Sequence, residues 1–325
     1  MESTAHAPGR GEPFDHAALF YRDARAYLAA TVPFLRRGLA AGEPVAAVLP
    51  APRLKLLTEA LGADAARVRL LDMREVGRNP GRIIPGVLRA FADAHPGAPW
   101  VRIIGEPVWA GRTDTEYPAC AAHEALINKA FAGRNVSILC PYDASALDPE
   151  ALADAAATHP VVWERGTRRT SADYAPERVV DACNRPLPEP AAPVATARFA
   201  AEHLELVRHF TTTHARRAGV QEERLPEIEM IVGELSANSV RHGGGSGTVR
   251  VWHEEGHFVC EVSDAGQITD PLAGRLPAPL TRPGGHGLLV VHHLSDLVRV
   301  HTGPGSTTTR AYIRLPWPSS PSKPA

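Results

Sequence analysis

The stretch Gly233–Gly245, GELSANSVRHGGG, lies in a predicted helix that begins near Pro226 and stops at three glycines. Successive helical residues advance by about 100°, so side chains three or four positions apart share a face. One stripe is apolar and consists of Ile228, Ile231, Val232, Leu235 and Ser239. The stripe beside it is polar and consists of Glu227, Glu234, Asn238 and Arg241, with His242 near the border. The helix is therefore expected to dock on a sheet by one stripe and to face a cleft with the other.

A solvated helix flank would also carry charged residues, and this simpler reading accounts for the glutamates. Asn238 argues against it, because asparagine is a poor residue for a helix interior and has no cap to make there. Its side-chain oxygen is a hard ligand of the kind that suits Mg²⁺. The helix thus indicates a polar cleft beside the core.

Three further motifs follow along the chain. Asp264 ends a predicted strand, where its carboxylate can accept a hydrogen bond from an amine while Gly266 allows close backbone approach. Gly285-His286-Gly287-Leu288 leads into a helix, whose N-terminal N–H groups suit a phosphate. Ser306–Thr309 begins the last strand with hydroxyl side chains. Each motif is common in ordinary turns and strands, so the prediction depends on their order.

In this order the motifs resemble the GHKL ATPase fold of gyrase, a heat-shock chaperone, histidine kinases and anti-sigma-factor kinases, over about residues 197–316. The resemblance implies an α+β two-layer sandwich, the Bergerat fold, that binds ATP with Mg²⁺. It implies that Glu234 is the general base, that Asn238 holds Mg²⁺ and that Asp264 binds the adenine amine. The other nucleotide contacts that it implies are Gly266, Gly285, His286, Gly287, Leu288 and Thr308.

Within that family, the compact ending at YIRLP and the sequence GGHGLLVVHHLSDLV look most like the bacterial anti-sigma-factor serine kinases. Gyrase and the chaperone have longer transducer domains. A histidine kinase needs a long dimerising hairpin, whereas the segment before Pro226 has room for one long helix. We therefore expect an ATP-dependent serine/threonine kinase, an enzyme whose partner is a sigma factor or an anti-sigma-factor antagonist. Two alternatives stay open: a non-catalytic, nucleotide-dependent binder of such a partner, and a sensor histidine kinase-like protein.

The first half of the chain alternates strands and helices. Apolar runs at 45–50, 68–72, 100–106, 136–143 and 161–164 predict strands covered on both faces. Helices are expected between them at 23–41, 53–61, 84–95, 117–131 and 149–158. This order predicts an α/β domain with a mostly parallel sheet, in which ligands bind at the C-terminal strand ends.

The stretches HAALFYRDARAYLAATVPFLRRGLAAGEPVAAVLP (16–50) and RIIGEPVW (102–109) resemble the MEDS sensory domain of regulators of one-carbon and methanogen-type metabolism. The resemblance covers about residues 15–165 and implies a RecA-like fold. The chain lacks GxxxxGK[ST], so we assign no P-loop and no second nucleotide site to this domain. A sensory pocket for an unknown small-molecule signal is expected to involve His16, Tyr21, Glu106 and Trp109, although each alone also suits an ordinary core or rim position.

The Pro/Ala-rich stretch 184–196 predicts a semi-rigid linker. It separates a MEDS-like domain at 14–183 from a kinase domain at 197–316, and residues 317–325 are expected to form a disordered tail. The resemblance suggests a homodimer, but the oligomeric state stays open.

The totals exclude several classes of protein. The 325 residues carry a net charge of −1, which favours neither nucleic-acid nor membrane-surface binding. No apolar run is long enough to span a membrane and the N-terminus lacks the apolar core of a signal peptide, so a cytoplasmic protein is expected. The four cysteines form no CxxC pair, and neither a zinc site nor a disulfide framework is expected.

Overall fold

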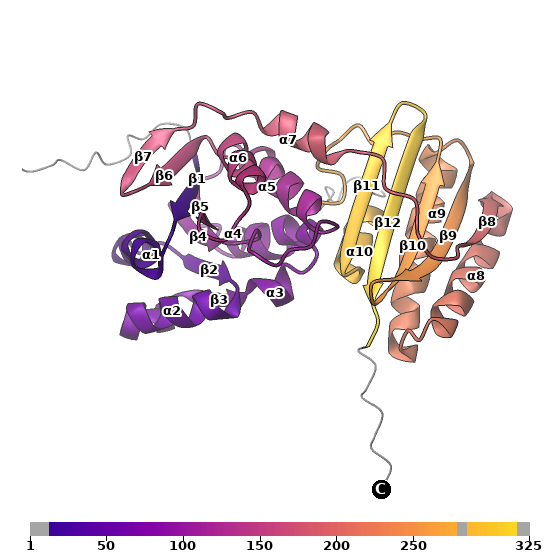
Figure 1. Ribbon diagram of the computed structural model, residues 1–325, viewed down its shortest axis with the longest axis horizontal. Helices are drawn as coiled ribbons and strands as arrows, with labels where there is room; N and C mark the ends of the chain where they lie inside the picture. Colours follow the sequence, from indigo (N-terminus) through magenta and orange to yellow (C-terminus); the bar gives the residue numbers. More distant parts are fainter. Residues whose placement is uncertain (1–12, 278–284, 317–325) are drawn as a thin grey trace, which may run out of the picture. The chain divides into compact units, whose positions relative to one another are not determined.

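The computed structural model describes residues 13–277 and 285–316, and its contacts divide the chain into two compact units (Figure 1). Unit 1 comprises residues 1–77 and 86–180, and unit 2 comprises residues 78–85 and 181–325. The predicted tail at 317–325 lies outside the described residues.

Unit 1 contains a seven-stranded sheet in the order β3-β2-β4-β5-β1-β6-β7. Its strands are β1 (Phe14–Tyr21), β2 (Val45–Leu49), β3 (Arg69–Asp72), β4 (Val101–Gly105), β5 (Val136–Asp143), β6 (Val161–Glu164) and β7 (Thr167–Thr170). All neighbouring pairs are parallel except β6 and β7. The mostly parallel sheet that the apolar runs predicted is therefore confirmed.

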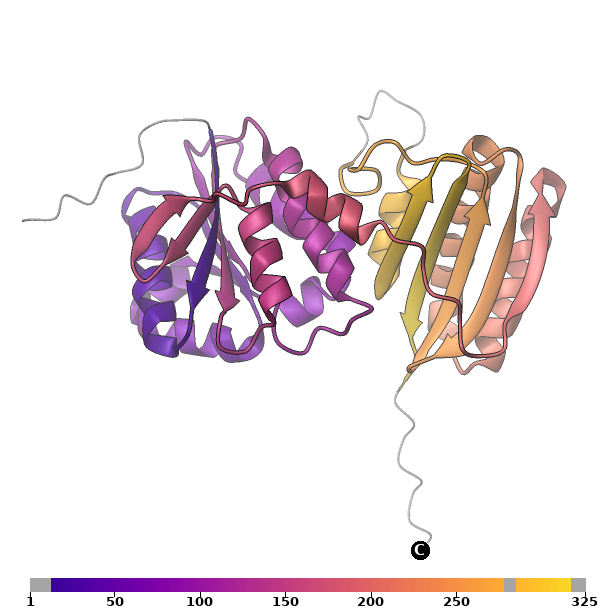
Figure 2. The ribbon, with the colours of Figure 1, turned by 45° about the horizontal axis from the view of Figure 1, so that its top comes forward.

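Helices cover both faces of this sheet (Figure 2). The longer ones are α1 (Ala24–Ala40), α2 (Ala51–Leu61), α5 (Tyr117–Phe131), α6 (Pro149–Thr158) and α7 (Pro176–Cys183). The side chains of α1 and α2 share a core with Ala17 and Leu19 of β1, whereas α5 reaches the alternate residue, His16. Alternation along β1 thus assigns His16 and Tyr21 to opposite faces of the sheet.

The predicted helix at 84–95 takes a different form. Residues Ile84–Arg89 form a π-helical segment, η3, and only Ala90–Asp93 continue as the α-helix α4. Short elements before it are η1 (Gly62–Arg67), α3 (Met73–Val76) and η2 (Pro80–Arg82). Strands β1 and β7 and helix α7 were not predicted; β7 is fully exposed, so it lacks an apolar pattern.

Unit 2 is an antiparallel five-stranded sheet in the order β11-β12-β10-β9-β8. Its strands are β8 (Ala195–Ala200), β9 (Ser246–Glu254), β10 (His257–Asp264), β11 (Leu297–Gly303) and β12 (Ser306–Arg314). Helices α8 (Leu204–Arg217), α9 (Leu225–His242) and α10 (Gly287–Leu294) cover one face, with the short turns η4 (Ala201–His203) and η5 (Glu222–Arg224) before α8 and α9 (Figure 1). This two-layer arrangement is the predicted α+β sandwich.

The apolar stripe of α9 forms the centre of that core. Ile228, Ile231 and Val232 have no exposed surface, and Leu235 is 3% exposed. These side chains pack with alternate residues of β9 and β10, including Val249 and Cys260. The docking stripe read from the sequence is confirmed.

Strand β8 lies at the start of the segment before Pro226, in which the sequence left room for one long helix. Ala195, Ala197 and Phe199 alternate with Thr196 and Arg198, and the apolar set faces the helices. Pairing with β9 satisfies the backbone of this segment, so the helix starts only at Leu204.

The Pro/Ala-rich linker runs along the other face of the sheet in unit 2 (Figure 2). Asn184 exchanges two hydrogen bonds with the backbone of Thr302, at 2.8 and 2.9 Å. Glu189 pairs with Arg250 at 2.6 Å, and the Pro188 carbonyl accepts a 3.0 Å hydrogen bond from Arg310. The linker is therefore anchored to the sheet along its length. No helix in the described part of the chain could cross a bilayer.

Candidate functional site

Asp264 lies at the end of β10, against the C-terminal half of α9. The Ser239 hydroxyl donates to one of its carboxylate oxygens at 2.6 Å, and the Gly266 N–H donates to the other at 2.8 Å. Each carboxylate oxygen can accept a second hydrogen bond. A donor such as an exocyclic amine can therefore bind a carboxylate whose orientation is already fixed.

Two glycines bring the backbone close to this carboxylate. A Cβ on Gly243 would lie 2.4 Å from Cγ of Asp264, and one on Gly266 would lie 2.6 Å from the His242 carbonyl oxygen. The Ala265 N–H donates to the Gly243 carbonyl at 3.1 Å, which ties the two loops together. The space around Asp264 thus exists only with glycine at both positions.

The last strand contributes Thr307 to this site. The register pairs Asp264 with Thr307, and the Thr307 hydroxyl donates to the Gly266 carbonyl at 3.0 Å. Thr308, which the sequence analysis proposed, pairs with Ser263 on the opposite face of the sheet, with 3.1 Å between the two hydroxyl oxygens. The sequence has three consecutive threonines here, so it could not indicate which hydroxyl faces the helices.

Glu234 and Asn238 lie one turn apart on the polar stripe of α9, and both are half-buried. Gly287, the first residue of α10, lies directly against them: a Cβ there would be 2.5 Å from Oε2 of Glu234 and 3.4 Å from Nδ2 of Asn238. The structure therefore brings together two predicted motifs that are about 50 residues apart in the sequence.

The remaining residues of the second motif surround this contact. Gly285 has a φ of 86°, a conformation that side-chain-bearing residues rarely adopt. His286 is the N-cap of α10 and is half-buried. Leu288 packs against the core, so only its backbone is available to a ligand.

The residues present fit ATP and Mg²⁺. Glu234 and Asn238 supply oxygen atoms, which Mg²⁺ prefers. The cradle of Gly243 and Gly266 leaves one side of Asp264 without a Cβ, as a flat base requires. The first turn of α10, with its free N–H groups, adjoins the oxygen donors. The oxygen donors and the three glycines are therefore compatible with bound ATP and Mg²⁺.

In unit 1, two of the four proposed sensory residues lie in one buried group. Tyr21 and Glu106, at the ends of β1 and β4, lie with Tyr27, Arg53 and Asp143; Arg53 pairs with Asp143 at 2.8 Å and lies 5.0 Å from the Tyr21 ring centre. We call this set the tyrosine–glutamate group. It occupies the C-terminal strand ends, where a ligand was expected.

Polar atoms in the tyrosine–glutamate group are left unsatisfied. Both tyrosine hydroxyls and Oε2 of Glu106 are buried with no hydrogen-bond partner among the described residues. Burial raises the pKa of Glu106 to about 8, with Arg53 acting in the opposite direction, and burial raises the pKa of both tyrosines above their usual value. Sequence reasoning missed Tyr27, Arg53 and Asp143, which come from α1, α2 and β5 and share no motif.

The other two proposed sensory residues have different neighbours. Trp109 is half-buried, and its ring centre lies 3.9 Å from the Arg112 guanidinium. His16 faces α5 on the opposite side of the sheet from Tyr21, where Nδ1 lies 3.0 Å from Oδ1 of Asn128. The four residues therefore do not line a single pocket.

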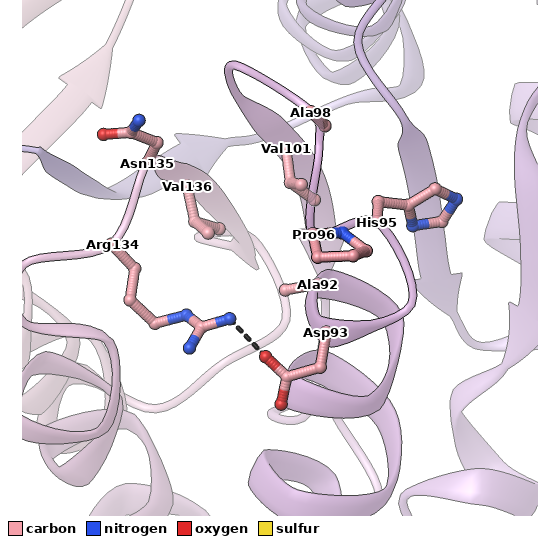
Figure 3. A pocket seen from close by; sticks show the side chains of 9 residues that line it. All are labelled: Ala92, Asp93, His95, Pro96, Ala98, Val101, Arg134, Asn135 and Val136. Carbon is pink, nitrogen blue, oxygen red and sulfur yellow. Dashed lines mark hydrogen bonds and ion pairs between the residues drawn. The ribbon is translucent and has the colours of Figure 1, made fainter.

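A cleft of about 360 Å³ opens in unit 1 at the starts of β4 and β5, and Figure 3 shows its lining. Val101 and Val136 form part of its wall, and Arg134 pairs with Asp93 across it. It contains none of the residues proposed from the sequence. Its place at the N-terminal strand ends is opposite to the end where ligands of such sheets usually bind.

Two family models match the chain. MEDS, the MEthanogen/methylotroph, DcmR Sensory domain, matches residues 15–160. The histidine kinase-like ATPase domain matches residues 197–313. The chain thus combines an N-terminal MEDS domain with a C-terminal ATPase domain of the GHKL type, as the motifs indicated. No curated protein matches the chain.

Several solved structures match part of the chain. The RsbU and RsbW domains of a Mycobacterium tuberculosis protein are 20% identical, with 39% of this chain and 34% of that chain covered and a TM-score of 0.31. The SiaB–SiaC complex of Pseudomonas aeruginosa gives 15% identity, coverage of 37% and 88%, and a TM-score of 0.30. The histidine kinase AdeS of Acinetobacter baumannii is 14% identical, with 38% of this chain and 68% of that chain covered and a TM-score of 0.24. The chain spans about a third of the first of these proteins.

Taken with the geometry of unit 2, the ATPase match supports an ATP-binding regulatory protein.

Proposed function

We propose that this protein is an ATP-dependent serine/threonine protein kinase of the anti-sigma-factor type, controlled by its sensory domain. The observation that carries the proposal is the contact of Gly287 with both Glu234 and Asn238, on the same helix that orients Asp264 through Ser239. Helix α9 thereby carries the proposed base and metal ligand, and it orients the proposed adenine acceptor on β10.

The nucleotide contacts follow from that arrangement. Asp264 accepts a hydrogen bond from the adenine amine, while Gly243 and Gly266 leave room for the base. Thr307 replaces Thr308 in our assignment, because it holds the Gly266 carbonyl beside Asp264. The backbone of Gly285, His286, Gly287 and Leu288 faces the phosphates at the start of α10.

Asn238 would hold Mg²⁺ through its side-chain oxygen. When bound, the ion neutralises phosphate charge during transfer. Glu234 accepts the proton of a substrate hydroxyl as that oxygen forms its bond to the γ-phosphorus and the bond to the leaving ADP oxygen breaks. Phosphoryl transfer depends chiefly on positioning and charge stabilisation, so one base and one metal ion suffice.

The partner follows from the family resemblance. A kinase of this type phosphorylates a serine or threonine on an anti-sigma-factor antagonist, so the proposed partner is that antagonist or a sigma factor. The MEDS domain would take a small-molecule signal, for which the unsatisfied tyrosine–glutamate group is our candidate pocket.

Two substitutions in α9 test the proposal. Asn238→Ala should abolish binding of Mg-ATP in calorimetry. Glu234→Ala should retain Mg-ATP binding but lose phosphate transfer to a serine or threonine of a partner identified by pull-down and mass spectrometry. Glu229→Ala, an exposed position on the same helix, is the matched control and should change neither.

The outcomes separate the alternatives. A wild-type chain that binds no ATP would end the proposal. Unchanged control of the partner by Glu234→Ala would favour the non-catalytic binder, and acid-labile phosphate on the chain itself would favour a histidine autokinase.

A further inference from the structure

Four side chains meet in the interior of unit 1, and we call them the His–Glu–Cys cluster. His16 lies on β1, Glu124 on α5 and Cys140 on β5, and His159 directly follows α6. Their exposed fractions are 0%, 1%, 1% and 0%. One potential ligand atom from each lies within 4.8 Å of all the others. Neither the ATP site nor the tyrosine–glutamate group includes any of them.

Three of the six distances between ligand atoms of the cluster are close to those of a four-coordinate metal site, and the other three do not exceed 4.8 Å. Nε2 of His16 is 3.5 Å from Oε2 of Glu124 and 3.5 Å from Sγ of Cys140, and Nε2 of His159 is 3.2 Å from Oε2 of Glu124. Bonds of about 2.0–2.3 Å from a tetrahedral zinc ion place neighbouring ligand atoms about 3.3–3.8 Å apart. The cluster therefore needs only small shifts to surround an ion.

Hydrogen bonds outside the cluster fix the orientation of both imidazoles. Nδ1 of His159 lies 2.8 Å from the Ala155 carbonyl oxygen, which can only accept, so Nδ1 carries the proton. Asn128 donates its NH₂ group to the carbonyls of Thr158 and Ala125, at 2.7 and 3.1 Å, so its Oδ1 accepts from Nδ1 of His16 at 3.0 Å. In the neutral rings, both Nε2 atoms thus present lone pairs to the cluster, as metal-bound histidines do.

Without an ion, this arrangement is electrostatically unsatisfied. Both oxygens of Glu124 and Nε2 of His159 are buried and make no hydrogen bond within the described residues. Nε2 of His16 can accept from the Cys140 thiol at 3.5 Å, whereas the lone pair on Nε2 of His159 faces a carboxylate oxygen at 3.2 Å with no hydrogen between them. Buried polar atoms left in this state cost about 1–3 kcal/mol each.

We propose that the His–Glu–Cys cluster binds one divalent transition-metal ion, Zn²⁺ in the first instance. Imidazole and thiolate ligands select such an ion over Mg²⁺ or Ca²⁺, which prefer oxygen. Two neutral imidazoles, one carboxylate and one thiolate balance a charge of +2, so the buried site becomes neutral.

The site has four protein ligands and no open position, which is typical of structural zinc. It joins β1, β5, α5 and the residue after α6, so metal binding stabilises the folded state of unit 1 directly. Backbone spacing did not reveal it, because its ligands span residues 16 to 159 and no two are close in the sequence.

Metal binding by the full-length chain tests this proposal. Protein purified from zinc-supplemented cells should contain about one zinc ion per molecule, as measured by inductively coupled plasma mass spectrometry. After chelator treatment, titration with Co²⁺ should give tetrahedral d–d bands in the visible range and a thiolate-to-cobalt charge-transfer band in the near ultraviolet, saturating at one equivalent.

Cys140→Ser should remove the charge-transfer band. Cys260→Ser, at a buried thiol of unit 2, is the matched control and should retain the band. If Cys140→Ser fails to fold, the titrations of the wild type and of Cys260→Ser decide. The absence of the band in wild-type chain at saturating Co²⁺ overturns the proposal, as does an equal band in folded Cys140→Ser.

Discussion

Asp264 receives one hydrogen bond on each carboxylate oxygen, from a helix residue and from a loop residue, so no rearrangement is needed before a ligand binds. An asparagine would have to turn its NH₂ group toward Ser239, because the Gly266 N–H requires an acceptor. The shape of the site would persist, but its negative charge and one acceptor oxygen would be lost.

We expect Asp264→Asn to weaken ATP binding at least tenfold, or about 1.4 kcal/mol, while the fold remains intact. Calorimetric titration with ATP measures the first effect, and thermal unfolding checks the second. Asp173→Asn, at an exposed position in unit 1, should bind ATP as the wild type does. An unchanged dissociation constant for Asp264→Asn would remove Asp264 from the adenine site.

Glu106 should make the stability of the protein depend on pH. Burial raises its pKa from 4.5 to about 8 in the folded chain. Between these values the carboxyl stays neutral when folded and ionises when unfolded, so its contribution to stability is complete below pH 4.5 and is lost as pH rises through about 8.

Glu106→Gln removes that dependence. Relative to wild type, the variant should gain stability as pH rises from 5 to 8, by up to about 1.4 kcal/mol per pH unit. The measurement is the free energy of unfolding by denaturant at several pH values. Parallel pH profiles of the two proteins would show that Glu106 ionises normally.

Helix α9 combines a structural and a chemical role on adjoining faces. Ile231 on its apolar stripe has no exposed surface, whereas its neighbour Met230 is 52% exposed. Glu234 and Asn238 of the second stripe lie against the first residue of α10, and Ser239, at the end of the apolar stripe, bonds to Asp264 at the end of β10. Loosening the apolar stripe should therefore disturb stability before it disturbs any specific ligand contact.

We expect Ile231→Ala to lower the free energy of unfolding of unit 2 by about 2–5 kcal/mol, because it leaves a cavity under the sheet. Met230→Ala should change it by less than about 0.5 kcal/mol. Denaturant unfolding compares the two. Equal effects at these adjacent positions would contradict the assigned orientation of α9.

The elements that could be predicted from the sequence are those whose pattern coincides with one burial environment. Strand β5 reads as an apolar run because seven of its eight residues are buried, and α9 shows its two stripes because each faces a different environment. Strand β8 was read as part of a helix, since its alternation is short and built partly from alanine. Strand β7, exposed throughout, has no pattern to detect.

For the whole molecule, ordered motifs pointed to residues that lie together in unit 2, whereas sequence spacing did not reveal which residues meet in unit 1. Glu234 and Asn238 are one turn apart, so any helix brings them together. His16 and Cys140 meet only because β1 pairs with β5 in a register that places His16 beside Ile138 and Ala18 beside Cys140. Such contacts depend on strand order, which local sequence does not encode, and the expectation of no zinc site rested on spacing alone.

If a signal bound to the sensory domain changes the affinity for ATP, the effect must be reciprocal. ATP binding must then change the affinity for the signal by the same factor. Hydrogen–deuterium exchange on the full-length chain can detect this without knowledge of the signal. ATP with Mg²⁺ should slow exchange in unit 2 around residues 234–245 and 285–290. It should also alter exchange in unit 1 at the strand ends that carry Tyr21 and Glu106.

Asn238→Ala is the control for this measurement, because a chain that binds no ATP should show neither change. Protection confined to unit 2 in the wild type would leave the ATP site intact but would contradict sensory control. Changes in both units that disappear in Asn238→Ala would instead show that ATP binding is energetically coupled to the MEDS domain. A signal bound at the tyrosine–glutamate group could then change ATP binding through the same coupling.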